Sequence, residues 1–328
     1  YDNGFPQEGT QGHHLVTAWQ KRNISLSGQG VINGNGPAFF GAAKPSPIKD
    51  SVWDREGRWR TSQMIGLVEC EMVRIEGLTF QNSPFWTIWP YACRDVTISN
   101  IKIRNDWKTP NGDGLDIDCC ENVVIANCDI VSGDDAIALR ADRLYSGLKR
   151  DLKNVAIRDC ILNTPLGGLR FGPSGEGSRI GEVTVTNCAI TADAAVLFTS
   201  TPYREYWQKG VLVENIDISH LSINAQAPLV MIESCGNQAS GFSNISISHM
   251  HGKSFGGCYL AGSGNGVFKD IRLADISYEV EKLESFRCHN SLLKSAFSAT
   301  GVKGLVMRKF CIDASQCAAG DLGSAVHF

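Results

Sequence analysis

Helical periodicity is scarce in this 328-residue chain, and no uninterrupted apolar run approaches the length of a membrane span. The formal net charge is only −3, so nothing indicates a nucleic-acid-binding surface or a basic membrane patch. The seven histidines are scattered and show no metal-ligand spacing. These shortages argue against a helical protein, a membrane protein and a nucleic-acid-binding protein, and we expect neither a metal nor another cofactor.

What the chain has is glycine, at 34 residues, and enough apolar residues, at 43%, to bury a large core. Many short strands joined by tight turns are expected from such a composition. The sequence starts at Tyr1 without a Met or an apolar leader, so we expect any signal peptide to have been removed or to lie outside the sequence. Loop-like stretches such as 34–46 do not mark a boundary, and we predict one domain over 1–328.

A strand of the form V-x-I-x-N/D-hydrophobic-x-I recurs along most of the sequence. Its copies begin at Val73, Val96, Val123, Val155, Val183, Val211, Ile245, Ile271 and Leu305. Between them lie second short strands such as GLDID and AIAL, with their own register. One motif kept at intervals of roughly 20–50 residues predicts coils that bury their inward side chains against neighbouring coils. We therefore predict an all-β fold, a right-handed parallel β-helix (solenoid).

Two other all-β folds also contain many short strands. A propeller blade needs four strands and a longer period, and an antiparallel sandwich would not keep one motif in phase over nine copies. Both are therefore less consistent with the repeat than a solenoid.

Twelve cysteines raise the possibility of disulfides, but three of them favour another explanation. Cys128, Cys160 and Cys188 occupy the same position in three successive repeats. Equivalent positions in stacked coils form a row along the axis, where a free cysteine packs as a small apolar residue. We predict such a row rather than bridges, so the cysteine count does not fix the redox compartment.

Two acidic segments are the candidates for chemistry: NGDGLDID at 111–118 and SGDDAIALR at 132–140. Asp113 and Asp134 are 21 positions apart, close to one coil, so Asp113 should lie beside Asp134 and Asp135 on one face. Carboxylates grouped on a rigid sheet are suited to general acid and base catalysis at a glycosidic bond. An exposed acidic patch or Asp-Gly turn is the alternative explanation.

With these segments, the chain resembles the polygalacturonase family of glycoside hydrolases (family 28). The resemblance runs from about Val16 to the late coils and includes ISLSGQGVINGNG at 24–36 and SGDDAIAL. It implies a right-handed parallel β-helix that hydrolyses pectic polysaccharides with inversion. It also implies that Asp134 is the general acid and that Asp113 and Asp135 activate the water.

Two family motifs are absent. Leu166-Gly167-Gly168 stands where Gly-His-Gly is expected, and Leu197-Phe198-Thr199 stands where Arg-Ile-Lys would contact a substrate carboxylate. Members that act on rhamnogalacturonan also depart from the histidine motif, and GGLRFG resembles their version. We therefore expect weak or no activity on unbranched polygalacturonate.

Six further residues are predicted to bind substrate or to support the site: Asp116, Arg140, Arg170, Tyr203, Trp207 and Glu233. A guanidinium fork at Arg140 or Arg170 suits a carboxylate or sulfate, although an ion pair with the acidic cluster is the alternative. Tyr203 and Trp207 lie in a polar loop and offer stacking faces for sugars. Trp86, Trp89 and Trp107 are interpreted as loop anchors.

Two functions of other kinds remain open. On the same fold, a polysaccharide lyase would bind Ca²⁺ at the aspartates and use an arginine as the base. A non-catalytic glycan-binding β-helix would bind without turnover. In each case the expected partner is a polysaccharide or oligosaccharide, and neither nucleic acid nor a membrane. The resemblance implies a secreted or periplasmic protein.

Overall fold

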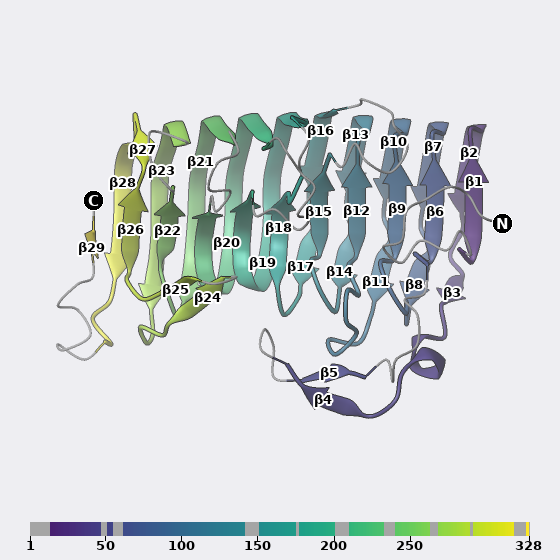
Figure 1. The fold of residues 1–328 in the computed structure, drawn as a ribbon, viewed down its shortest axis with the longest axis horizontal. Coiled ribbons are helices and arrows are strands. Elements are labelled where there is room, and N and C mark those ends of the chain that lie inside the picture. The colour runs from purple at the N-terminus through teal and green to yellow at the C-terminus, as the bar shows by residue number, and fades with distance from the viewer. Residues whose placement is uncertain are drawn as a thin grey trace.

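The computed structural model describes residues 14–46, 51–54, 62–141, 151–174, 177–200, 210–232, 240–262, 268–288, 291–317 and 326–327. Within these ranges 25 strands join in one curled sheet, and its coils stack in a line from the N-terminal to the C-terminal end (Figure 1). Neighbouring coils pair in parallel, as β10 and β13 do. The parallel β-helix predicted from the repeat is confirmed. Among the described residues no helix has the length and apolarity needed to cross a membrane.

Each coil contributes to three faces of the solenoid. Face 1 contains β2 (Arg22–Ser27), β7 (Glu71–Glu76), β10 (Arg94–Ser99), β13 (Glu121–Ala126), β16 (Leu152–Arg158) and β27 (Val302–Lys303). Face 2 contains β3 (Val31–Asn33), β8 (Thr79–Gln81), β11 (Lys102–Arg104), β14 (Asp129–Val131) and β17 (Ile161–Asn163). Face 3 contains β1 (Val16–Trp19), β6 (Ile65–Val68), β9 (Ile88–Tyr91), β12 (Leu115–Asp118), β15 (Ile137–Arg140), β18 (Gly167–Phe171), β22 (Cys258–Ala261), β26 (Phe297–Thr300) and β29 (Val326–His327).

Later coils use longer strands that bend from one face to the next. β19 (Arg179–Thr199) and β20 (Leu212–Ile232) pass through all three faces, whereas β21 (Gly241–Ser254), β23 (Phe268–Val280) and β28 (Val306–Asp313) cover faces 1 and 2. Outside the coils lie a short 3₁₀ helix, η1 (Gly36–Phe39), and two antiparallel hairpins, β4–β5 (Ala43–Pro45, Ser51–Trp53) and β24–β25 (Phe286–Cys288, Ser291–Leu293). In Figure 1 the β4–β5 hairpin lies below the stack.

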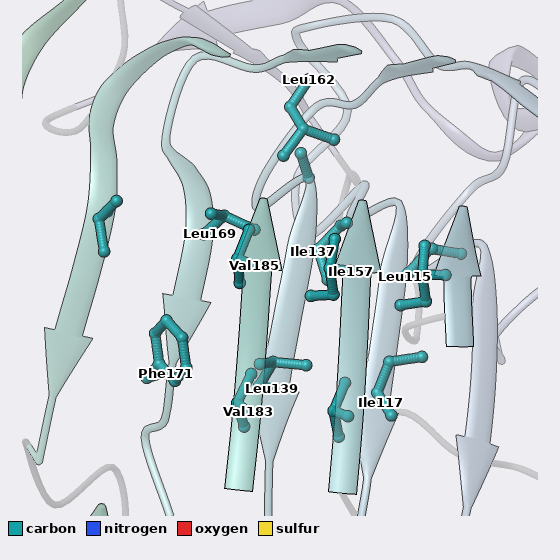
Figure 2. Close-up of a cluster of buried hydrophobic side chains, with 14 of the residues drawn as sticks. Leu115, Ile117, Ile137, Leu139, Ile157, Leu162, Leu169, Phe171, Val183 and Val185 are labelled. Carbon is teal, nitrogen blue, oxygen red and sulfur yellow. The ribbon is translucent and has the colours of Figure 1, made fainter. Parts of the chain in front are cut away.

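The interior is built from aligned rows of apolar side chains. On face 1 one row contains Val73, Val96, Val123, Val155 and Val183, each at most 2% exposed. Figure 2 shows how the rows of face 1 and face 3 meet: Ile157 and Val185 from face 1, and Leu115, Ile137 and Leu169 from face 3. Alternation along each strand sends these residues inward and their neighbours outward, as the period-2 pattern predicted.

One copy of the repeat was placed wrongly. The sequence motif predicted a copy that begins at Val211, but Val183 pairs with Ile216, which in turn pairs with Ile245. The correct copy is IDISHLSI at 216–223, five residues later. Both stretches alternate apolar and polar residues, so the pattern alone could not separate the face-1 strand from the residues that lead into it.

The Asn or Asp at the fifth position of the motif has a backbone role. Asn100, Asn127, Asp159 and Asn187 all have φ between 54° and 57°, in the left-handed region. They lie where the chain turns from face 1 to face 2. Asn and Asp tolerate this conformation better than other residues with a Cβ. The polar position of the repeat is therefore explained by the turn it must make.

We expect Asn127→Val to lower the free energy of unfolding by about 1–2 kcal/mol, because a β-branched side chain is strained at positive φ. Asn127 is exposed, so packing contributes little to this difference. Asn127→Gly is the matched control, since glycine adopts this φ without strain. Chemical denaturation of both variants measures the effect, and equal stabilities would contradict the role of the turn.

The cysteine row is confirmed. Cys128, Cys160 and Cys188 are free and at most 2% exposed. In later coils the same row continues as Leu221, Met250 and Ile276. Apolar residues replace the thiols in this row, which shows that the position requires burial rather than sulfur chemistry.

Candidate active site

The turn between face 2 and face 3 brings the three predicted aspartates together. Leu115 pairs with Ile137, so Asp113 and Asp135, each two residues earlier, lie on adjacent coils. One carboxylate oxygen from each of Asp113, Asp134 and Asp135 lies within 4.8 Å of the others. The three residues are 4%, 7% and 2% exposed, respectively. The juxtaposition predicted from their spacing is therefore present, at a buried position on the outer side of face 3.

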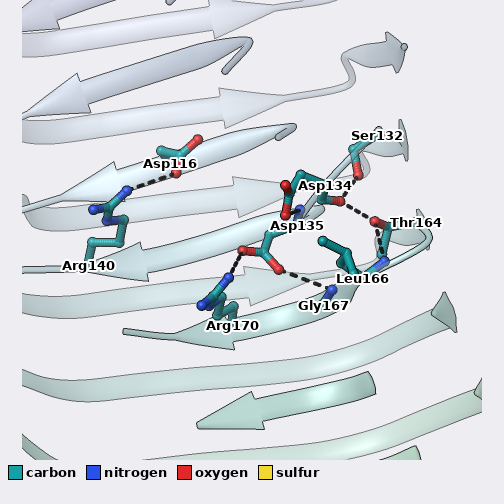
Figure 3. Close-up of polar contacts among 9 residues, drawn as sticks. All are labelled: Asp116, Ser132, Asp134, Asp135, Arg140, Thr164, Leu166, Gly167 and Arg170. Atoms are coloured by element: carbon teal, nitrogen blue, oxygen red, sulfur yellow. Dashed lines mark hydrogen bonds and ion pairs between the residues drawn. The ribbon is translucent and has the colours of Figure 1, made fainter. Parts of the chain in front are cut away.

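Local packing fixes the backbone of the aspartate doublet. A Cβ at Gly133 would lie 2.6 Å from the carbonyl oxygen of Asp106, so only glycine fits there. The hydroxyls of Ser132 and Thr164 both donate to the backbone carbonyl of Asp134 (Figure 3). The Asp134 carboxylate accepts the N–H of Asp135 at 3.1 Å. These contacts turn the chain so that two consecutive carboxylates reach one site, which an ideal strand would not allow.

Asp135 is held by a positive charge from the next coil. Its Oδ2 lies 2.6 Å from Nη1 of Arg170, and its Oδ1 accepts the N–H of Gly167 at 3.1 Å (Figure 3). A Cβ at Gly167 would lie 2.5 Å from that same Oδ1. Both partners donate hydrogen bonds to the carboxyl group, and the lack of a side chain at Gly167 permits the close approach.

Asp113 has the opposite environment. Desolvation raises the pKa of its carboxyl well above the ordinary value, and the negative charges of Asp116 and Asp134 raise it further. Arg170 opposes this shift only in part. The Oδ1 of Asp113 is buried and accepts no hydrogen bond from the described residues. The Asp113 carboxyl, with its raised pKa, therefore lies beside Asp135, whose carboxylate is paired with a guanidinium and a backbone N–H.

Asp116 and Arg140 form a second pair on the outer side of face 3. Their closest atoms, Oδ1 and Nη1, are 3.8 Å apart (Figure 3). The Arg140 guanidinium also lies 4.5 Å from the ring centre of Trp86. Burial raises the pKa of the Asp116 carboxyl well above the usual range, although Arg140 lowers it. Asp116 is thus next to the catalytic candidates and completely buried.

The other predicted substrate-binding residues fall into two groups. Arg170 pairs with Asp135 of the cluster and Arg140 with the neighbouring Asp116, and such ion pairs are the arrangement that the sequence left open as the alternative to substrate contact. Tyr203, Trp207 and Glu233 lie outside the described residues.

A groove of about 580 Å³ begins beside the cluster and follows the turn between faces 2 and 3. Its lining residues are Ser51, Trp107, Lys108, Thr164, Pro165, Thr191, Ala192, Asp193, Asn224, Ala225, Gln226 and Phe255. The three aspartates do not line the groove themselves, but Thr164 does, and its hydroxyl donates to the Asp134 carbonyl, so the groove and the cluster are adjacent. The groove is therefore the candidate path for substrate.

Sequence reasoning missed the residues of this groove. Trp107 was interpreted as a loop anchor, yet it is 46% exposed and lines the groove with Lys108. Their position in the sequence could have indicated this role, because both residues precede Asp113 in the same turn. Asp193 gave no signal, since it stands alone among small residues.

Burial raises the pKa of Asp193 from 3.8 to about 7. Between pH 3.8 and about 7, the folded chain keeps a proton on Asp193 that the unfolded chain releases. The stabilising contribution of this proton is therefore complete below pH 3.8 and is lost as the pH rises to about 7. We expect Asp193→Asn to gain thermal stability relative to the parent at pH about 7.5, but not at about 4. Thermal midpoints at both pH values test this. Asp217→Asn on face 1 is the exposed control, and a pH-independent difference for Asp193→Asn would contradict the prediction.

The three aspartates also have the donor type that Ca²⁺ prefers. Asp135, however, already binds the Arg170 guanidinium and a backbone N–H. A cation at this position would have to displace or face that guanidinium, so the pairing with Arg170 disfavours a calcium site here.

Comparison with known proteins gives one family. The model of "Glycosyl hydrolases family 28" matches residues 5–296. A probable polygalacturonase of Arabidopsis thaliana is 26% identical over 285 residues, covering 80% of this chain and 58% of that protein. A second one from the same plant is 30% identical over 167 residues, covering 50% of this chain and 31% of that protein. The chain thus spans less than two thirds of these relatives.

Solved structures agree on the fold. A hyperthermoactive exopolygalacturonase from Thermotoga maritima superposes with a TM-score of 0.71 at 19% identity, covering 92% of this chain and 72% of that one. A polygalacturonase from Erwinia carotovora gives a TM-score of 0.58 at 14% identity, covering 93% and 73%. With a family model that matches most of its length, the chain belongs to family 28 of the glycosyl hydrolases.

Proposed function

We propose that this protein hydrolyses glycosidic bonds in a pectic or other acidic polysaccharide. The observation that carries the proposal is the cluster of Asp113, Asp134 and Asp135, which sets a carboxyl of raised pKa beside a carboxylate paired with arginine, next to a groove. Hydrolysis of a glycosidic bond requires one carboxyl that gives a proton and one carboxylate that accepts one. Family membership and relatives named polygalacturonases support the same chemistry.

The roles follow the family resemblance. Asp134 gives its proton to the leaving oxygen, while Asp113 and Asp135 orient a water and accept its proton. Because the three carboxyls lie close together, they share the proton that the mechanism requires, and Asp134 holds it when substrate is bound. Arg170 is a positioning residue that pairs with Asp135 and holds its carboxyl group toward the water.

We further propose inversion at the anomeric carbon, which rests on the resemblance. The closest oxygens of the cluster lie within 4.8 Å, whereas whole carboxyl groups in many inverting enzymes are roughly 6.5–9.5 Å apart. The configuration of the first product, read by proton NMR before mutarotation, is the deciding measurement. A product that keeps the configuration of the substrate would refute inversion.

The polymer is proposed to differ from plain polygalacturonate. Leu197, at the position of the missing arginine, is 8% exposed and packs with Ala194 and Val230 in an apolar cluster. Such a surface offers no partner for a uronate carboxylate. A polymer in which neutral sugars alternate with uronates, as in rhamnogalacturonan, fits these substitutions better.

We also propose that residues 1–328 act as one domain, that the polysaccharide is the partner rather than nucleic acid or a membrane, and that the protein works outside the cytoplasm. The continuous stack of coils supports the first point, and the extracellular location of pectic polymers supports the last.

A panel of pectic polymers and defined oligosaccharides tests the proposal. New reducing ends without ultraviolet absorbance, in the presence of a chelator, are expected from a hydrolase. Products that absorb through a new double bond and require Ca²⁺ would instead identify a lyase. Binding without any product would identify a glycan-binding protein, and either result would overturn the proposal.

A further inference from the structure

We propose that the enzyme attacks chain ends, because the loop around Trp107 and Lys108, braced by the β4–β5 hairpin, closes the groove beside the aspartates. The inference rests on the proposed function and specifies its mode of action. Three features of the structure support it: a wall at one end of the groove, buried flanks on both sides of the cluster, and an open floor in the remaining direction.

The wall is formed by two segments far apart in the sequence. Trp107 and Lys108 come from the turn between β11 and β12, and Ser51 comes from β5. The backbone N–H of Trp53 donates to the carbonyl of Lys108 at 2.9 Å, and the Lys108 ammonium lies 5.0 Å from the Trp53 ring centre. The turn is also packed on the catalytic coil, since Gly133 lies against the carbonyls of Asp106 and Thr109. The wall is therefore anchored to the hairpin on one side and to the aspartate turn on the other.

The outer side of face 3 is buried on the N-terminal side of the cluster. Trp86 and Trp89, on the coil before Asp113 and Asp116, are 8% and 0% exposed. His14 accounts for part of this cover: its Nδ1 lies 2.9 Å from the carbonyl of Gln63, and its ring centre is 6.1 Å from that of Trp89. Among the described residues, this coil therefore offers a polysaccharide no exposed side chain on face 3 at Trp86 or Trp89.

The C-terminal side is buried as well. Leu197, Val230 and Tyr259 follow Arg170 in one row across successive coils. Leu197 is 8% exposed and the other two are fully buried. Phe286 of β24 stacks on Tyr259, with ring centres 6.0 Å apart. An open cleft along face 3 would expose this row to sugar rings, but the row is buried.

The groove is open in the direction away from the wall. The groove crosses three coil-to-coil steps between Thr164 and Ser254, the residue before Phe255. At roughly 4.8 Å per step, this is a length of about 14 Å. Thr191 and Asn224 on its floor are exposed. A short stretch of polysaccharide therefore fits along the floor, with its end against the wall and its terminal bond beside the aspartates. Lys108 supplies a positive charge to an acidic terminal sugar.

Viscometry together with product analysis tests the inference on the polymer that the substrate panel selects. We expect one short product from the first time point, while viscosity stays near its starting value as reducing ends accumulate. A rapid early fall in viscosity with a ladder of intermediate lengths would leave hydrolysis intact and overturn the end-attack proposal. Absence of products from every polymer would overturn the proposed function and this inference with it.

Variants of the wall add a second test. Trp53→Ala and Lys108→Ala loosen the wall, and we expect longer products to appear with them. Val124→Ala, an exposed change on face 1, is the matched control and should keep the single product. A product-length distribution is not altered by a general loss of stability. An unchanged single product in both wall variants would refute the role given to these residues.

Discussion

Asp134→Asn is expected to lower kcat about 10²–10⁴-fold, the range for loss of a general acid or base. The amide has nearly the shape of the carboxyl group but has no proton of suitable acidity to give to the leaving oxygen. Folding should persist, because Ser132 and Thr164 bind the backbone carbonyl at this position rather than the side chain. The Asp135 N–H can still donate to the amide oxygen.

Asp113→Asn should have a comparable effect, and the two variants separate the roles. If Asp134 is the acid, activated leaving groups such as nitrophenol should restore much of the rate of Asp134→Asn but little of the rate of Asp113→Asn. Asp217→Asn, exposed on face 1, controls for the loss of one carboxylate. Initial rates and thermal midpoints measured together distinguish catalysis from folding. Turnover near that of the parent in both site variants would end the assignment of catalysis to this cluster.

The fold could be predicted because the repeat is local. The V-x-I motif is eight residues long, and in several copies a left-handed Asn or Asp shows where the chain turns. The misplaced copy at Val211 shows the limit of this information. Coils differ in length through the loops between their faces, and these lengths decide which of two similar alternating stretches pairs with Val183.

The site was predicted in part for the same reason. Asp113 and the 134–135 doublet lie in adjacent coils of nearly regular length, so their spacing was informative. The partner of Asp135 is Arg170, 35 residues away, and its choice depends on the exact register of the third coil. The wall of the groove was beyond reach, because the β4–β5 hairpin leaves the repeat and returns to a turn more than 50 residues later.

Arg170→Met is expected to lower the free energy of unfolding by about 3–5 kcal/mol, because it leaves a buried carboxylate without its partner. Asp135 is 2% exposed, and among the described residues its ion pair is with Arg170, at 2.6 Å. The double variant Arg170→Met with Asp135→Asn should recover much of the loss, because no charge remains buried.

Arg158→Met breaks the exposed pair with Asp159 and should cost less than about 1 kcal/mol. Chemical denaturation of the four proteins forms the comparison, and a double variant less stable than Arg170→Met would show that Arg170 stabilises the coil through packing rather than through its charge.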